Sequence, residues 1–189
     1  MPYWLELDRV TMPLVRQLHE IWQAKRTGTA LPRRADFDPL DLKSVLPNLM
    51  IVEPEPEPFR LRYRLVGTKI ARVSGFDFTG RYLDEILRPG LPDDWHHYYR
   101  VSYENRRPVY GLINSPTRDG DSFIYEFGIF PLRLGGDRVE QFFSLEDFGG
   151  REPYSNQLVG ERQRDTGLRD AGQDHTDQGA SRAAAEGSQ

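Results

Sequence analysis

Residues 60–66 carry the clearest alternation of apolar and polar side chains in the chain. Three apolar residues alternate there with three arginines: Leu61, Tyr63 and Leu65 against Arg60, Arg62 and Arg64. Successive side chains of a strand point to opposite faces, so the pattern predicts a strand with one apolar face and one basic face. Gly67 ends this strand, and residues 69–73 predict a short helix before Gly75.

A second periodic stretch lies near the N-terminus. Apolar residues recur there at helical spacing: Leu14, Val15, Leu18, Ile21 and Trp22. The spacing predicts an amphipathic helix with Thr11 as its N-cap and Pro13 in its first turn. Two interpretations of the apolar stripe stay open. Either it packs on the sheet of its own domain, or it forms a homodimer contact through Leu14, Leu18, Ile21 and Trp22.

The strand at residues 60–66 has an expected partner at residues 49–53, which form the first apolar run after a long connector. The proline-rich segment 53–58 separates the two, and it predicts an exposed connection because proline donates no hydrogen bond to a strand ladder. Residues 82–87 predict a short helix. Residues 92–107 predict a longer one, whose shared face carries Trp95, Tyr98, Tyr99 and Ser102.

The C-terminal part of the pattern is rich in strands. Three are predicted, at residues 109–114, 122–132 and 138–147, and the Asp119-Gly120 pair predicts a hairpin between the first two. In the last strand, Val139, Gln141, Phe143 and Leu145 share one face. The periodicity as a whole therefore predicts an α+β domain.

Composition narrows the class of protein. A chain of 189 residues with 38% hydrophobic content has room for one core, and its net charge of −4 does not favour nucleic-acid binding. It has no cysteine, and no stretch is long and apolar enough to span a membrane. We therefore expect a cytoplasmic protein without a thiolate metal site. Residues 149–189 are poor in apolar side chains and predict a disordered tail.

Several motifs resemble a family of small bacterial proteins that consist of a stand-alone PAS domain, formerly a domain of unknown function. They are RYRLVGTKI at residues 62–70, the turn GFDFTGR at 75–81, and the segments 31–53 and 131–143. The resemblance implies a PAS fold: a five-stranded antiparallel sheet with helices crossing one face, preceded by the N-terminal amphipathic helix. It divides the chain into an extension (1–30), a PAS domain (31–148) and the tail (149–189).

The PAS resemblance implies a ligand pocket between the sheet and the helix at residues 92–107. The residues expected to line it are mostly aromatic: Trp95, Tyr98, Tyr99, Ser102, Tyr125, Phe127 and Phe143. Strand aromatics are also the usual filling of a core, so core packing is the competing interpretation for the last three. No histidine, cysteine or carboxylate spacing in the sequence predicts a metal site.

Cofactors are not identified by the sequence. His96 or His97 would be the axial ligand if the domain held haem, as in some haem-binding PAS domains, but a histidine pair on a helix is a weak motif. Flavin is not expected either. The flavin adduct of light-sensing PAS domains needs a cysteine, which the chain lacks, and non-covalent flavin binding stays an open alternative that no sequence feature favours. The arginines at positions 60, 62 and 64 either bind an anion or form the solvated face of the sheet.

No catalytic motif is recognisable in the chain. An isomerase-like site could be built from Asp77 and Tyr125, but nothing in the sequence brings them together. The leading hypothesis is therefore a non-enzymatic sensory module. It would form a homodimer and act by contact with a signalling protein, with or without a small-molecule ligand. The alternatives are a haem or other cofactor sensor, and a small lyase or isomerase.

Overall fold

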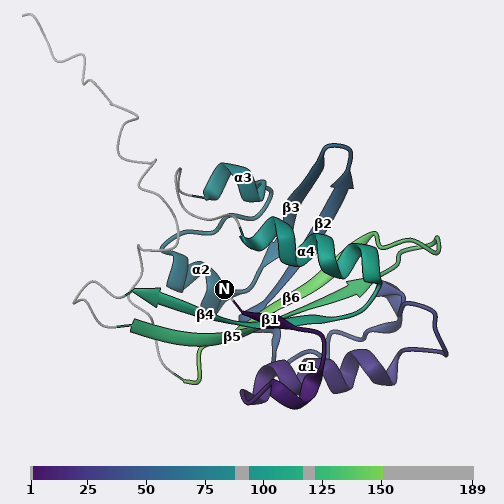
Figure 1. Cartoon of the computed structure of the whole chain (residues 1–189), viewed down its shortest axis with the longest axis horizontal. Helices are drawn as coiled ribbons and strands as arrows, with labels where there is room; N and C mark the ends of the chain where they lie inside the picture. The colour runs from purple at the N-terminus through teal and green to yellow at the C-terminus, as the bar shows by residue number, and fades with distance from the viewer. Residues whose placement is uncertain (1, 88–93, 117–121, 151–189) are drawn as a thin grey trace, which may run out of the picture.

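The structure is a computed structural model, and it describes residues 2–87, 94–116 and 122–150. Six strands form one antiparallel sheet in the order β1-β4-β5-β6-β2-β3 (Figure 1). Their bounds are β1 Tyr3–Trp4, β2 Leu49–Pro56, β3 Phe59–Val66, β4 Val109–Pro116, β5 Ser122–Leu132 and β6 Gln141–Asp147. The helices are α1 Pro13–Ala24, α2 Thr68–Ser74, α3 Leu83–Ile86 and α4 Asp94–Asn105, with 3-10 turns at Leu7–Arg9, Arg34–Asp36 and Leu46–Asn48. The predicted α+β class and PAS-type architecture are confirmed.

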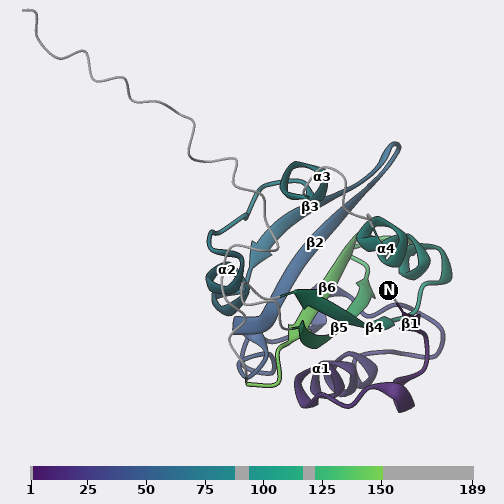
Figure 2. The same ribbon diagram turned by 60° about the vertical axis from the view of Figure 1, so that its left-hand side comes forward.

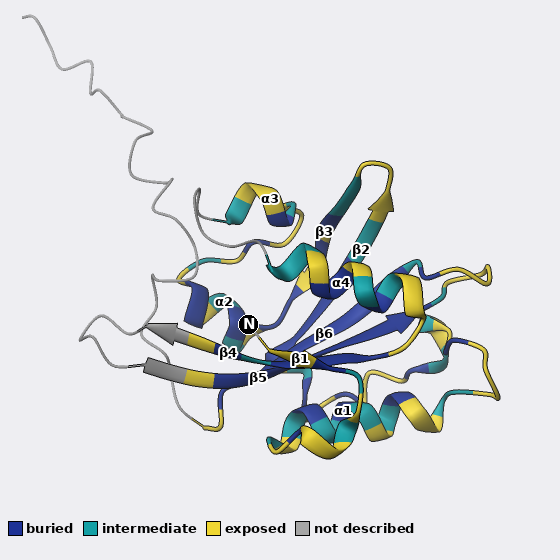
Figure 3. Ribbon diagram, in the orientation of Figure 1, coloured by how far each residue is buried: buried dark blue, intermediate teal, exposed yellow. Residues whose placement is uncertain are grey.

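Both faces of the sheet are covered. Helices α2, α3 and α4 lie over one face, and α1 lies on the opposite face (Figures 1 and 2). The centre of the sheet is buried as a result, and α1 exposes only its outer side (Figure 3). Residues 125–132 of β5 are buried on both faces. This explains why β5 reads as a nearly continuous apolar run rather than a strict alternation.

Helix α1 packs on its own sheet, as the first of the two interpretations predicts. Leu18 and Trp22 have no exposed surface, and the Trp22 indole donates a 2.9 Å hydrogen bond to the Pro131 carbonyl. Gly128 allows the close approach of α1, because a Cβ there would lie 3.0 Å from the side chain of Val15 in α1. Leu18 and Trp22 therefore offer no free surface to a second chain, and only Leu14 and Ile21 of the predicted dimer contact keep partial exposure.

The start of α1 differs from the prediction. Met12, not Thr11, is the N-cap residue, and it makes no side-chain cap. The Thr11 and Met12 amides instead donate to the carboxylate of Glu126 in β5, at 2.9 and 2.8 Å. The Leu14 amide donates to Asp147 in β6 at 2.8 Å. Two carboxylates from the sheet thus satisfy amides that a helix start leaves without partners.

The β2–β3 hairpin is longer than predicted. β2 continues through Pro54 to Pro56, although the proline-rich segment was expected to be a loop. Beyond Val52, β2 pairs only with β3 among the described residues, so this part of β2 is an edge strand. Proline is tolerated in an edge strand because no second neighbouring strand needs its missing N–H group.

A register shift in this hairpin changes which side chains face inward. The shift occurs opposite Ile51 and Val52, where Arg64 is the extra residue of β3. It turns Leu65 outward, and this side chain is 39% exposed although the alternation predicts it on the apolar face. Leu61 and Tyr63 are buried as predicted.

Strand β1 is absent from the prediction. It has two residues, Tyr3 and Trp4, which pair with Gly111 and Tyr110 of β4. The segment before residue 31 therefore contributes both a strand and a helix to the domain. The hairpin predicted at Asp119-Gly120, the start of the helix predicted at residue 92, and nearly all of the predicted tail lie outside the described residues.

Candidate ligand cavity

A cavity of about 60 Å³ lies between the sheet and the helices α2, α3 and α4. The sheet contributes one side chain from each of four strands: Met50, Tyr63, Tyr125 and Glu146. The helices and the loop after α2 contribute the rest, which are Ile70, Ser74, Phe78, Leu83, Ile86, Leu87, Trp95 and Tyr99. The wall is mostly apolar, with a small number of polar groups, as is usual for small-molecule sites.

The alternation of the strands places the cavity side chains. Phe127 of β5 lies opposite Glu146 of β6 in the antiparallel register, so Tyr125, Phe127 and Glu146 face α4. Phe142 faces the same side, where its ring contacts Tyr99 with centroids 5.2 Å apart. The cavity floor is therefore formed by the β5 and β6 side chains that point away from α1.

Among the described residues of the cavity wall, Glu146 is the one with a carboxyl group. It is 8% exposed, and no hydrogen bond or ion pair within the described part of the chain reaches its carboxyl group. Burial raises the pKa of Glu146 from the ordinary 4.5 to about 8. The group is thus mainly neutral at pH 7 and both donates and accepts hydrogen bonds in that state.

Two tyrosines share this environment. Burial raises the pKa of Tyr99, and Glu146 raises it further, while the Ser144 hydroxyl lowers it. Burial likewise raises the pKa of Tyr125 well above 10, again with a contribution from Glu146. Both phenols therefore stay neutral at physiological pH, and the carboxyl group lies near enough to influence each. The polar side of the cavity consists of uncharged hydroxyl groups around one carboxyl group.

The structure brings part of the predicted pocket together. Trp95, Tyr99 and Tyr125 line the cavity. Tyr98 and Phe127 lie beside it rather than in its wall, with ring centroids 5.1 Å apart. Ser102 donates a 2.9 Å hydrogen bond to the Arg107 carbonyl near the end of α4, which is a structural role.

Phe143 does not belong to the pocket. Its ring contacts Phe37 at 5.0 Å, and the Arg34 guanidinium lies over it at 5.3 Å. It therefore lies on the α1 face of the sheet. The error came from the choice of face: the sequence shows that Phe142 and Phe143 point in opposite directions, but only the pairing of β6 with β5 shows which of them faces α4.

The other candidate residues lie away from the cavity. His97 is exposed and its ring packs against Tyr3, and neither His96 nor His97 is in the cavity wall. Asp77 is exposed and accepts the Thr79 amide at 2.9 Å in a local turn, so it does not meet Tyr125 in a catalytic pair. Among the residues that the structure describes, no three His, Asp or Glu side chains are placed to hold a metal ion.

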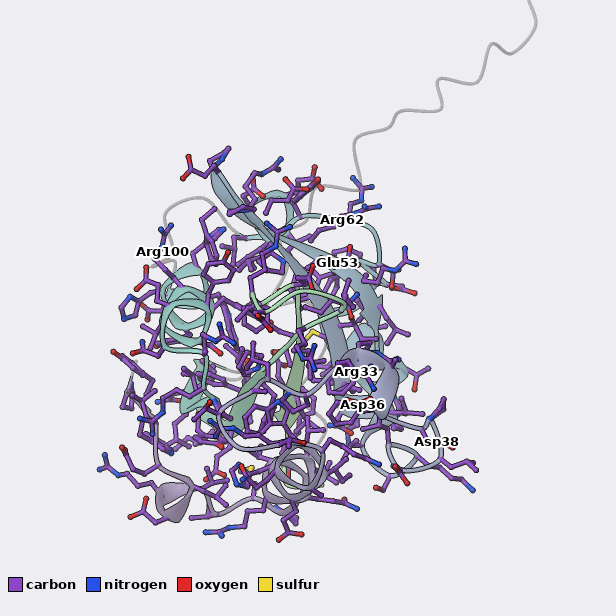
Figure 4. The ribbon with its side chains drawn as sticks, turned by 90° about the vertical axis from the view of Figure 1, so that its right-hand side faces the viewer. Arg33, Asp36, Asp38, Glu53, Arg62 and Arg100 are labelled. Atoms are coloured by element: carbon purple, nitrogen blue, oxygen red, sulfur yellow. The ribbon has the colours of Figure 1, made fainter. Side chains whose placement is uncertain are left out.

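The arginines of β3 lie on the outer side of the sheet. Arg60 bonds to Asp84 of α3 at 2.9 Å, and Arg64 lies 3.8 Å from Glu53. Arg62 and Glu53 are cross-strand neighbours and lie side by side on this outer surface (Figure 4). Acidic side chains of the protein itself thus accompany the arginines, which matches the solvated-face interpretation rather than an anion site.

The β2–β3 hairpin supports both walls of the cavity. Arg60 connects it to α3 through Asp84 and also lies over the Tyr82 ring at 3.8 Å. At the tip of the hairpin, the ring of Phe59 contacts the ring of Tyr103 in α4, with centroids 5.6 Å apart. The Arg100 guanidinium, also from α4, lies over the Phe59 ring. These contacts fix α3 and α4 relative to the sheet and so define the width of the cavity.

Sequence reasoning missed Glu146. The available signal was an acidic residue within an apolar strand, at a position where period-two alternation places it beside Phe142 and Ser144. Its burial follows from α4, which covers this end of β6. The pairing register of β6 with β5 places Glu146 opposite Phe127, and this register cannot be inferred from the residues next to Glu146 in the sequence.

Comparison with known proteins supports the architecture. A family model described as a PAS domain matches residues 10–145. No curated protein matches the chain. Within the described residues, no helix is both long and apolar enough to cross a membrane.

Light-oxygen-voltage (LOV) domains are among the similar solved structures. One, studied with a flavin analogue, is 18% identical, with a TM-score of 0.44, and covers 60% of this chain and 86% of its own. An RNA-binding LOV receptor is 20% identical, with a TM-score of 0.44. The match covers 66% of this chain and 37% of the receptor chain. The LOV protein of Rhodobacter sphaeroides is 14% identical, with a TM-score of 0.42. The match covers 72% of this chain and 68% of that protein's chain.

The prediction that flavin is not expected is corrected by this comparison. The similar solved structures named above are light-oxygen-voltage domains, and one was studied with a flavin analogue. Flavin therefore stays among the ligands to be tested. Since the TM-scores lie below 0.5, the likeness does not by itself assign a ligand or a partner to this chain.

Proposed function

Because the chain belongs to the PAS domain family, we propose that it is a sensory module that binds a small molecule in the cavity beside Glu146. The observation that carries the proposal is the buried carboxyl group. A polar group without a partner in an apolar setting costs stability, and proteins retain such groups mainly at functional sites. A ligand that hydrogen bonds to Glu146 would supply the missing partner.

Strand β6 connects the cavity to the other face of the sheet. Glu146 points into the cavity, and the next residue, Asp147, accepts the Leu14 amide at the start of α1. A ligand that shifts the end of β6 would therefore change the position of α1. Transmission requires that the ligand bind one arrangement of α1 more tightly than the other.

We propose that the output is contact with a signalling protein in the cytoplasm, and that the module acts as a homodimer. The sequence supports this role, because no recognisable catalytic motif is present. The described cavity wall also contains no histidine or lysine to act beside Glu146 as a second acid or base. We propose no catalytic activity for the cavity.

The test is a screen of small molecules against isotope-labelled protein, read by NMR at the Trp95 indole. We expect compounds that shift this resonance to lose their effect in Ile86→Phe, because the larger side chain fills the cavity. Leu40→Phe is the matched control, since Leu40 is 77% exposed and lies outside the cavity wall. Binding that survives Ile86→Phe unchanged would contradict the site.

Native mass spectrometry and an absorbance spectrum of the freshly purified protein complete the test. An added mass identifies a retained ligand, an absorbance band beyond that of the aromatic residues reveals flavin or haem, and the subunit count tests the homodimer. A protein that carries no ligand and responds to none in the screen would contradict the sensory proposal.

A further inference from the structure

The cavity combines one carboxyl group with aromatic walls. Its aromatic side chains come from three strands or helices and one loop: Tyr63, Phe78, Trp95, Tyr99 and Tyr125. None of the described lining residues is a lysine, arginine or histidine. Aromatic rings attract cations through their negative faces, and a buried carboxylate requires a positive partner. On this basis we propose that the ligand is a small alkylammonium cation, an inference that rests on the proposed function.

The size of the cavity restricts the cation. Its volume of about 60 Å³ is less than half of the roughly 150 Å³ in which an apolar cavity holds benzene. A branched or short alkylammonium ion is smaller than benzene and matches this space. Its alkyl groups contact the apolar side chains of α3, and its N–H groups reach the carboxyl group of Glu146.

Binding is coupled to a proton. In the empty cavity Glu146 is protonated below about pH 8, because burial disfavours its charged form. The groups that face it are Tyr99 from α4 and Tyr125 from β5, whose pKa values burial raises so that both stay neutral. The phenol of Tyr63 from β3 and the hydroxyl of Ser74 from α2 lie in the same wall. The entering ammonium pairs with the carboxylate, and the carboxyl proton leaves to solvent. One positive charge therefore enters as another leaves.

A neutral ligand would behave differently. An alcohol or carbonyl compound would hydrogen bond to the protonated Glu146 and would bind less well as the carboxyl group ionised. The cation binds better as ionisation proceeds. The sign of the pH dependence therefore separates the two classes of ligand.

The experiment compares isopropylammonium chloride with isopropanol, which has the same branched skeleton without the charge. Each is titrated into the labelled full-length protein from pH 6 to pH 9 and read at the Trp95 indole. An alkyl amine stays protonated over this range. We expect the affinity for isopropylammonium to rise about 50-fold between pH 6 and pH 8 and then to level off, since it follows the ionised fraction of Glu146.

Two variants separate a charge effect from a loss of fold. Glu146→Gln keeps the shape of the side chain, and we expect it to lower the affinity for isopropylammonium at pH 8.5 by at least about tenfold and to remove its pH dependence. Glu104→Gln lies on the exposed side of α4 and should leave both unchanged. The amide NMR spectrum shows whether each variant is folded.

The outcomes distinguish this inference from the function on which it rests. Isopropanol or another neutral compound that shifts Trp95 while isopropylammonium does not would overturn the cation and keep the cavity as a ligand site. Isopropylammonium binding without pH dependence, or unchanged in Glu146→Gln, would also overturn the role of the carboxylate. If neither probe binds and the wider screen finds no ligand, both proposals fail.

Discussion

Buried carboxyl groups have hydrogen-bond donors on one face of the sheet and lack them on the other, among the residues that the structure describes. On the α1 face, Glu126 and Asp147 are each 3% exposed, and both accept hydrogen bonds from backbone amides at the junction where α1 begins. On the cavity face, Glu146 is also buried, but no hydrogen bond to its side chain is found among the described residues. The first pair is fully explained by the fold. Glu146 is not, and this contrast is the reason we propose the cavity face as the ligand-binding one.

The contrast is sharpest within β6. Glu146 and Asp147 are consecutive residues, and strand geometry sends them to opposite faces. Both are largely removed from water, yet only Asp147 gains amide donors in return, from Leu14 and from Gly149. A designed structural core would place an apolar residue at position 146. A ligand-binding role, as we propose, accounts for a carboxyl group at this position.

The largest expected effect is on the α1 face. Leu18→Asp places a charge in the centre of the helix–sheet contact and removes a fully buried side chain, so we expect a loss of at least about 4 kcal/mol in unfolding free energy. Chemical denaturation measures it, with the exposed Gln23→Asp as control at less than about 1 kcal/mol. A folded, stable monomer would instead assign the stripe to a dimer contact.

The next effect is the pH dependence caused by Glu146. Between pH 4.5 and 8 the folded chain holds the Glu146 proton that the unfolded chain releases, so stability falls as pH rises and then levels off. From pH 5 to pH 9 we expect Glu146→Gln to gain up to about 4 kcal/mol relative to the native chain. Denaturation curves of both proteins at several pH values test this, and parallel curves would contradict it.

A smaller loss is expected at Glu126. Glu126→Gln keeps an acceptor for the Thr11 and Met12 amides but removes the charge, so we expect a cost of about 1–2 kcal/mol. Hydrogen exchange should rise at the start of α1 before it rises at the centre of the sheet. Uniformly faster exchange would show that Glu126 stabilises the whole fold and not specifically the contact with α1.

The smallest effect is expected at Asp147. Asp147→Asn retains a hydrogen bond to the Leu14 amide and loses only the interaction of a charge with the helix start, which is worth about 1 kcal/mol. If α1 responds to the cavity through β6, this variant should also weaken the effect of a bound ligand on exchange at Leu14. An unchanged ligand effect would remove β6 from the path to α1.

Local patterns in the sequence predicted much of this fold. The alternation in β3 and the apolar face of α4 come from neighbouring residues, and they correctly placed Tyr63, Trp95 and Tyr99. Features set by distant segments were missed. The register shift that exposes Leu65 depends on β2, and the two-residue β1 is too short to carry a periodic signal.

The chemistry of the cavity was even less accessible from the sequence. The side of the sheet that Glu146 and Phe143 face depends on the pairing of β6 with β5, and the carboxylate caps of α1 connect residues more than 110 positions apart. An acidic residue near the end of a strand is usually solvated. Only the position of α4 over β6 reveals that this one is buried.

The measurement that tests the central claim most directly is the titration of the Glu146 side chain, followed by the 13C NMR shift of its carboxyl carbon. Glu146→Gln assigns the resonance. A midpoint near pH 8 would show a buried carboxyl group without a compensating partner. A midpoint near the ordinary value of 4.5 would show that the group is solvated or paired, and the assignment of the cavity as a ligand site would lose its basis.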